Sequence, residues 1–174
     1  FVCDTTAFAA LTGFDFHRGC LALVHRPGAA PWPDLLGDTG VVVVLEGVTN
    51  ADNVGGVFRN AAAFGVTAVL LSPGCCDPFY RKSIRTSMGA VLRVPFARLE
   101  PWPDGLMELR RAGFQIAALS PREPSVTLEA FALTERSRPR LALLVGTEGP
   151  GLSAEAERCA DVRVRIPIAG LVDS

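Results

Sequence analysis

Three segments of the 174-residue sequence contain residues that could bind a ligand or act on it. In the first, Asn53 and Arg59 lie on either side of the pair Gly55-Gly56, at the predicted start of a helix. Two glycines there permit close approach of a backbone or a ligand, and a helix N-terminus favours an anion. The residues alone leave a second interpretation open, in which Asn53 only caps the helix and Arg59 is solvated.

The second segment, Gly146 to Leu152, contains three glycines, a proline and one charged residue, Glu148. It matches neither the P-loop pattern nor the dinucleotide-binding pattern G-x-G-x-x-G, so by itself it is weak evidence for a site. The third segment, Pro167 to Ser174, follows the last predicted strand and ends the sequence.

A fourth stretch of the sequence is basic. No acidic residue lies between Asp77 and Glu100, whereas five of the 17 basic residues do. Arg81, Lys82 and Arg85 are therefore candidates for phosphate contacts, which are electrostatic and independent of base sequence. A solvated basic face is the alternative interpretation of the same residues.

The apolar pattern predicts a scaffold that brings these segments together. Strand-like and helix-like patterns alternate from residue 41 onward, which favours an α/β fold with a mainly parallel sheet and helices on both faces. We expect strands at 41–48, 67–71, 115–119, 140–145 and 162–168, and helices at 53–64, 80–91, 103–112 and 153–160. Ligands of open parallel sheets bind beyond the carboxyl ends of the strands, where the three segments lie.

The N-terminal part of the sequence has a different character. Residues 26–38 are rich in turn-forming residues and are expected to be a linker. Residues 1–25 would then be the tail of a preceding small domain, and residues 39–174 the main domain.

Composition excludes several classes of protein. With 49% hydrophobic and 20% charged residues, the chain is expected to fold. Its net charge of −1 means that any nucleic acid must bind a local basic patch. No stretch is long and apolar enough to cross a membrane, and the sequence shows no signal peptide. The five scattered cysteines lack metal-ligand spacing, so we expect no metal site and a reducing, cytoplasmic location.

Taken together, the three segments resemble the motifs of a known family. The patterns are N-x-G-x-x-x-R at 53–59, G-x-E-G-x-G-L at 146–152 and I-P-x-x-G-x-x-x-S at 166–174. They are similar to the three motifs of the SpoU/TrmH family, which are SPOUT-class, S-adenosylmethionine-dependent RNA 2′-O-ribose methyltransferases. Residues 80–90 are similar to the basic R-x-S-x-G segment of the same family.

The resemblance implies a C-terminal deep trefoil knot and a homodimer that acts on rRNA or tRNA. S-adenosylmethionine would be held mainly through backbone groups of the motifs, namely those of Gly146, Ile166, Ile168 and Gly170. The catalytic residues that it implies are Asn53, Arg59, Glu148 and Ser174. Residues 1–25 would be the remnant of a small α/β substrate-binding domain.

The resemblance also assigns roles to the motif residues. A guanidinium stays protonated in proteins, so Arg59 is interpreted as a cation for phosphate and developing alkoxide, not as a base. It would serve a pocket completed by the second subunit. Asn53 would orient the ribose or Arg59, and Ser174 would form hydrogen bonds.

The sequence departs from the family pattern at one point. The third motif of the family continues from serine as S-L-N, whereas the sequence ends at Ser174, which we interpret as a truncation. Two other functions stay open beside the methyltransferase. An inactive RNA-binding relative is the first. A nucleotide-binding α/β oxidoreductase that uses the 146–152 loop is the second, and the missing G-x-G-x-x-G argues against it.

Overall fold

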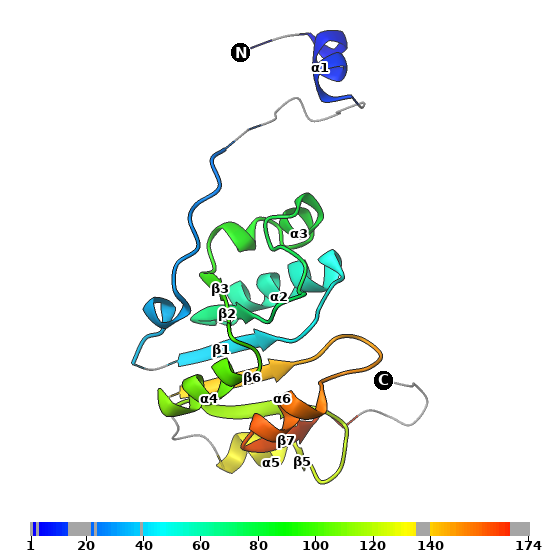
Figure 1. Cartoon of the computed structure of the whole chain (residues 1–174). Helices are drawn as coiled ribbons and strands as arrows, with labels where there is room; N and C mark the ends of the chain where they lie inside the picture. The colour runs from blue at the N-terminus through cyan, green and yellow to red at the C-terminus, as the bar shows by residue number, and fades with distance from the viewer. Residues whose placement is uncertain are drawn as a thin grey trace.

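A computed structural model of the chain describes residues 2, 4–13, 22, 24–38, 40–134 and 140–167. Within these ranges it contains a parallel sheet with the strand order β3-β2-β1-β6-β4-β7-β5 (Figure 1). The strands are β1 (Gly40–Leu45), β2 (Ala68–Leu71), β3 (Phe96–Arg98), β4 (Gln115–Leu119), β5 (Val126–Thr127), β6 (Arg140–Val145) and β7 (Val162–Arg165). The predicted parallel α/β fold is confirmed.

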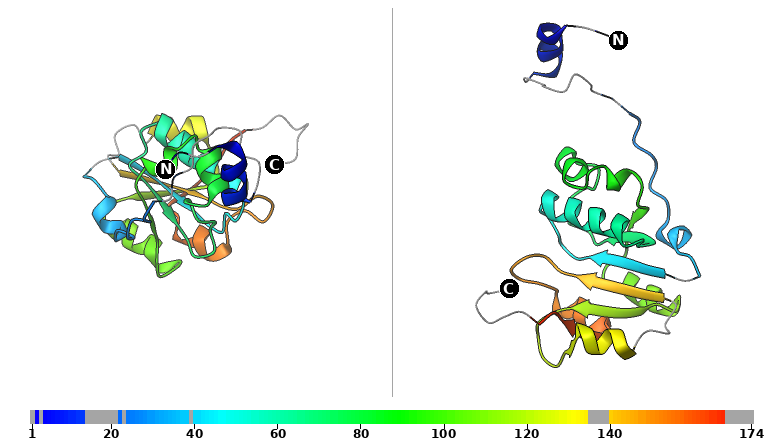
Figure 2. Two further views of the ribbon diagram at one scale, coloured as in Figure 1. Left: turned by 90° about the horizontal axis from the view of Figure 1, so that it is seen from above. Right: turned by 180° about the vertical axis from the view of Figure 1, so that it is seen from behind.

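Helices cover both faces of this sheet (Figure 2). One face carries α2 (Ala51–Ala63), α3 (Arg81–Thr86) and α5 (Leu128–Thr134), and the other carries α4 (Asp104–Arg111) and α6 (Ala154–Cys159). Successive side chains of a strand point to opposite faces, so Val42 and Val44 of β1 pack toward α4 while Val43 and Leu45 pack toward α2. Burial on both faces explains the unbroken apolar run of this strand.

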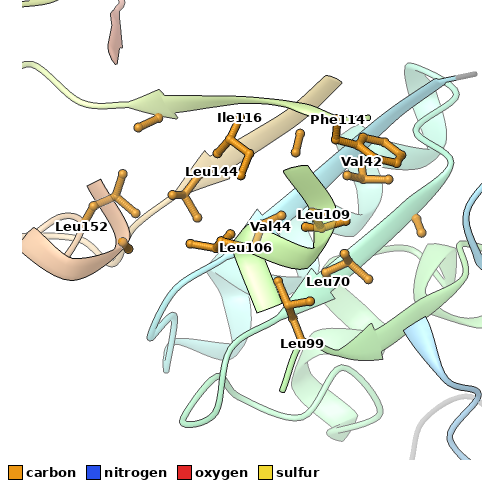
Figure 3. Packing of buried hydrophobic residues seen from close by; sticks show 14 of the residues in the cluster. Val42, Val44, Leu70, Leu99, Leu106, Leu109, Phe114, Ile116, Leu144 and Leu152 are labelled. Atoms are coloured by element: carbon orange, nitrogen blue, oxygen red, sulfur yellow. The ribbon is translucent and has the colours of Figure 1, made fainter. Parts of the chain in front are cut away.

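The α4 face illustrates how the core is built. Leu106 and Leu109 of α4 lie over Val44 and Leu70, with Ile116 and Leu144 beside them, and all six are fully buried (Figure 3). Each such side chain contributes about 1.5–3 kcal/mol relative to exposure. This packing holds the central strands, and hence the loops at their carboxyl ends, in fixed positions.

The predicted helix at 80–91 is wrong in extent. α3 ends at Thr86, and a separate 3₁₀ turn, η2 (Ala90–Leu92), follows it. The interruption is at Met88 and Gly89, whose φ angles are 54° and 79°. A left-handed backbone cannot continue a right-handed helix, so the chain turns at this point.

Other boundaries also differ from the prediction. β1 ends at Leu45 rather than at residue 48, and β7 ends at Arg165 rather than at residue 168. The sequence patterns did not predict the short strands β3 and β5 or the helix α5. The helix α2 ends as expected, because Val66 N donates to Ala61 O across Gly65, whose φ is 67°.

The N-terminal residues contain two short helices, α1 (Thr5–Thr12) and the 3₁₀ turn η1 (Trp32–Leu35). The trefoil knot stays a prediction, because residues 168–174 lie outside the described ranges. The domain boundaries also stay predictions, because most of residues 14–23 lie outside these ranges. Among the described helices, none has the length and apolar character that crossing a membrane requires.

Candidate functional site

The described parts of the three motif segments follow the carboxyl ends of three strands of the same sheet, β1, β6 and β7. β1 leads into α2, β6 leads into the 146–152 loop, and β7 leads to Ile166 and Pro167. Because β4 lies between β6 and β7, the loop after β4 must lie between the second and third motifs. That loop begins at Ser120, and no sequence pattern pointed to it.

The start of α2 differs from the expectation. Its N-cap is Asn50, whose side chain accepts a hydrogen bond from Asp52 N at 2.9 Å, so Asn53 lies inside the helix. The interpretation of Asn53 as the cap is therefore wrong. Six residues of helix separate Asn53 from Arg59 by about 9 Å along the axis and about 240° around it. The two side chains leave α2 in different directions and do not face one ligand within this chain.

Asn53 instead contacts the second motif. Its Nδ2 donates a hydrogen bond to Oε2 of Glu148 at 3.3 Å. Both side chains are exposed, so this pair faces solvent at the ends of β1 and β6. An amide and a carboxylate that meet in this way can orient a hydroxyl and accept its proton.

The glycines of the second motif build a closed loop. Thr147 and Gly151 form an isolated antiparallel bridge, in which Gly151 N donates to Thr147 O at 3.0 Å. A Cβ on Gly146 would lie 2.3 Å from the carbonyl carbon of Gly151. No residue other than glycine therefore fits at position 146, and the loop turns back on the end of β6.

Glu46, which belongs to none of the motifs, binds Ser153 at the point where this loop leads into α6. Its Oε2 accepts from Ser153 N at 2.8 Å, and its Oε1 accepts from Ser153 Oγ at 2.6 Å and from Trp102 Nε1 at 3.1 Å. Ser153 Oγ in turn accepts from Ala156 N and caps α6. In the sequence, only the position of Glu46 directly after a buried strand could have indicated this role.

Glu157 forms a second buried link beside the same loop. Its side chain is 5% exposed, and its Oε1 accepts from Ser120 Oγ at 2.8 Å. Arg122 Nη1 lies 3.5 Å from Oε2, while Arg122 Nη2 donates to Pro150 O at 3.3 Å. Arg163 Nε lies 3.3 Å from Oε2 as an ion pair without hydrogen-bond alignment. This network ties the loop after β4 to the 146–152 loop.

Gly55 permits the close approach of a backbone, which is one of the two roles expected for it. A Cβ at this position would lie 2.7 Å from Ser83 O and 2.8 Å from Thr86 Cβ, so the glycine lets α3 pack against α2. Gly56 faces open space.

An ion pair joins the same two helices. Asp52 accepts from Thr86 Oγ1 at 2.8 Å and pairs with Lys82 Nζ at 2.7 Å. The hydrogen bonds from Lys82 and Thr86 hold the pKa of Asp52 below its usual value, and Asp52 raises the pKa of Lys82. Lys82 is thus engaged with Asp52. Arg81 and Arg85 are exposed on α3.

The remaining predicted site residues are placed as follows. Arg59 is exposed on the second half of α2, and Ile166 is 59% exposed just after β7. Ile168, Gly170 and Ser174 lie outside the described residues. In the described ranges, no three His, Cys, Asp or Glu side chains form a group that could hold a metal ion.

Comparisons with known proteins agree with the geometry. Residues 40–174 match the family model described as the SpoU rRNA Methylase family. An uncharacterized tRNA/rRNA methyltransferase of Mycobacterium tuberculosis is 46% identical over 167 residues, which are 95% of this chain and 57% of the relative. The 23S rRNA (guanosine-2′-O-)-methyltransferase RlmB of Nitrosomonas europaea is 30% identical over 177 residues, with 99% of this chain and 66% of that protein covered.

A solved structure shares the fold. The AdoMet-bound rRNA methyltransferase of Sinorhizobium meliloti superimposes with a TM-score of 0.75 at 30% identity, covering 84% of this chain and 55% of that one. The chain thus spans between half and two thirds of the length of these relatives.

Proposed function

Because the chain belongs to the SpoU rRNA methylase family, we propose that the protein transfers a methyl group from S-adenosylmethionine to a ribose 2′-hydroxyl of structured rRNA or tRNA. The single observation that carries this proposal is the contact of Asn53 with Glu148, which joins two family motifs at the ends of adjacent strands. The names of the relatives and the AdoMet-bound neighbour support the same reaction. We further propose that the protein works as a cytoplasmic homodimer.

The described residues fit a nucleoside cofactor that is held mainly through backbone groups. The 146–152 loop brings backbone groups to the end of β6, and Ile166 offers an exposed apolar side chain at the end of β7 for a flat purine ring. We assign Gly146 and Ile166 to this pocket, together with Ile168 and Gly170. Bound S-adenosylmethionine would supply an electrophilic methyl group on a sulfonium sulfur.

The proton of the 2′-hydroxyl needs an acceptor, because a neutral hydroxyl is a poor nucleophile. Glu148 is the carboxylate of the second motif, and the Asn53 amide orients it, so we assign the proton to Glu148. Ser174 would add a hydrogen bond at the same site.

Arg59 binds RNA phosphate and stabilises negative charge on the ribose oxygen in this proposal. Because it leaves α2 in a different direction from Asn53, it would serve the site of the second subunit. A permanently charged guanidinium suits this role and cannot act as the base.

Titration calorimetry of the full-length protein with S-adenosylmethionine and with S-adenosylhomocysteine tests the cofactor assignment. Both should bind, whereas NAD should not. Ile166→Asp should weaken binding, while Leu133→Asp, an equally drastic change at an exposed position of α5, should leave it unchanged. Absence of binding by the intact protein would contradict the proposal, and binding of NAD would favour the oxidoreductase alternative.

A further inference from the structure

An open hollow with a volume of about 510 Å³ lies beside the second half of α2. Arg59 lines it from α2, and Ser87, Met88, Arg93 and Pro95 line it from the segment that follows α3. Among the described residues of the three family motifs, only Arg59 of the first lines the hollow.

The charged side chains that line this hollow, Arg59 and Arg93, are both positive. None of the described residues that line it carries a carboxylate, and the segment at 78–99 contains no acidic residue. The only acid of α2, Asp52, is at the other end of the helix and is paired with Lys82. In the described part of the chain, neither Arg59 nor Arg93 has a carboxylate partner, whereas Arg110 and Arg140 do. Two exposed guanidinium groups therefore meet no negative charge among the residues that line the hollow.

Met88 adds an apolar surface to the same hollow. Its φ of 54° is unusual for a residue other than glycine, and its side chain is 73% exposed. Its exposed side chain thus lies as apolar surface in the same hollow as the two guanidinium groups. The unbranched thioether of methionine packs readily against flat aromatic groups.

We propose that this hollow binds one nucleotide of the substrate RNA, with its phosphate between Arg59 and Arg93 and its base against Met88. The inference rests on the proposed function and adds Arg93 and Met88 to the RNA-binding residues. Planar guanidinium groups match phosphate oxygens in pairs, and the absence of carboxylates removes competition for them. RNA fits this combination better than a protein surface does, because its phosphates supply the missing negative charge at every nucleotide.

The test measures RNA affinity of the full-length protein as a function of salt. Arg93→Ala should weaken binding about tenfold at low salt and flatten the slope of log K against log salt by about 0.7, as expected for one lost phosphate contact on a single strand. Arg93→Lys should keep the slope, because lysine keeps the positive charge. This variant separates the effect of the lost charge from the effect of the changed side-chain shape. Arg111→Ala, at an exposed arginine of α4 on the opposite face of the sheet, should change neither quantity.

Met88→Gly tests the base contact separately. Glycine adopts positive φ without strain, so this variant removes the side chain and keeps the turn. RNA binding should weaken several-fold with an unchanged salt slope, because the lost contact carries no charge.

Two results would overturn the inference. One is a wild-type salt slope in Arg93→Ala, and the other is a change of its oligomeric state in analytical ultracentrifugation, which would make the hollow a contact between subunits. Calorimetry with S-adenosylhomocysteine keeps the two proposals apart. Absence of cofactor binding in the wild type would contradict the proposed function, whereas a failure confined to Arg93→Ala would contradict only the RNA site.

Discussion

Asn53 of α2 donates a hydrogen bond to Glu148 at 3.3 Å, although 95 positions separate the two residues in the sequence. The contact exists because β1 and β6 are parallel neighbours, so that the segments following them begin at the same edge of the sheet. This hydrogen bond joins the first and second motifs, each of which is weak evidence for a site by itself.

The first prediction concerns the proton acceptor. Glu148→Gln keeps the size and the contact with Asn53 but removes the negative charge, so methyl transfer should fall by about 10²–10⁴-fold. Single-turnover assays with saturating RNA and cofactor measure this rate. Binding of S-adenosylhomocysteine should stay within about twofold of the wild type, because the variant keeps the loop. A wild-type rate in Glu148→Gln would remove this residue from the chemical step.

The second prediction concerns the support of the glycine loop. Glu46→Ala leaves Ser153 N and Trp102 Nε1 without their acceptor, so unfolding free energy should fall by about 1–3 kcal/mol. Chemical denaturation gives this value. Glu100→Ala, at an exposed glutamate, is the matched control and should change stability by less than about 0.5 kcal/mol. Equal stability of the two variants would show that Glu46 does not hold the start of α6.

A pair of glycine substitutions tests the packing of α2 on α3. Gly56→Ala should raise stability by about 0.5–1 kcal/mol, because alanine has the higher helix propensity and the position is open. Gly55→Ala should instead lower it by about 1–3 kcal/mol, since the added Cβ would overlap Ser83 O. Thermal denaturation distinguishes the two signs. Stabilisation by both alanines would mean that the two helices do not pack closely at Gly55.

The ion pair of Asp52 with Lys82 predicts a pH dependence. The pKa of Asp52 is lowered in the folded protein, so its stabilising effect is complete above the unfolded pKa and is lost as pH falls through the folded one. The pKa of Lys82 is raised, so its effect is lost only as pH rises through that higher value. The Tm difference between wild type and Asp52→Asn should therefore be constant from about pH 6 to 8 and shrink below about pH 4. A difference that persists in acid would contradict the ion pair.

The central strands were predictable from the sequence because their physical signal is local. β4 and β6 begin and end where the apolar runs do, since strands buried on both faces show few polar positions. The helix cap was different, because Asn50 and Asn53 are equally good capping residues and tertiary packing decides between them.

Contacts between distant residues explain what could not be predicted at the site. Nothing local at Lys82 indicates that Asp52 binds it, and nothing at Gly55 shows that Ser83 lies against it. Likewise, the link from Arg122 to Pro150 depends on β4 lying beside β6, which the order of elements along the chain does not reveal. The spacing of Asn53, Arg59 and Glu148 predicted a site only through its resemblance to the motifs of the family.

Methyl transfer to the ribose of RNA is the activity to measure. The full-length protein is incubated with rRNA and tRNA from cells lacking its gene and with S-adenosylmethionine labelled in the methyl group. The RNA is then hydrolysed in alkali, where a 2′-O-methylated ribose leaves an intact dinucleotide. We expect label in alkali-resistant dinucleotides with the wild type and its loss with Arg59→Ala. Label found only in mononucleotides, which would place the methyl group on a base, or no label at all, would contradict the proposed ribose methylation.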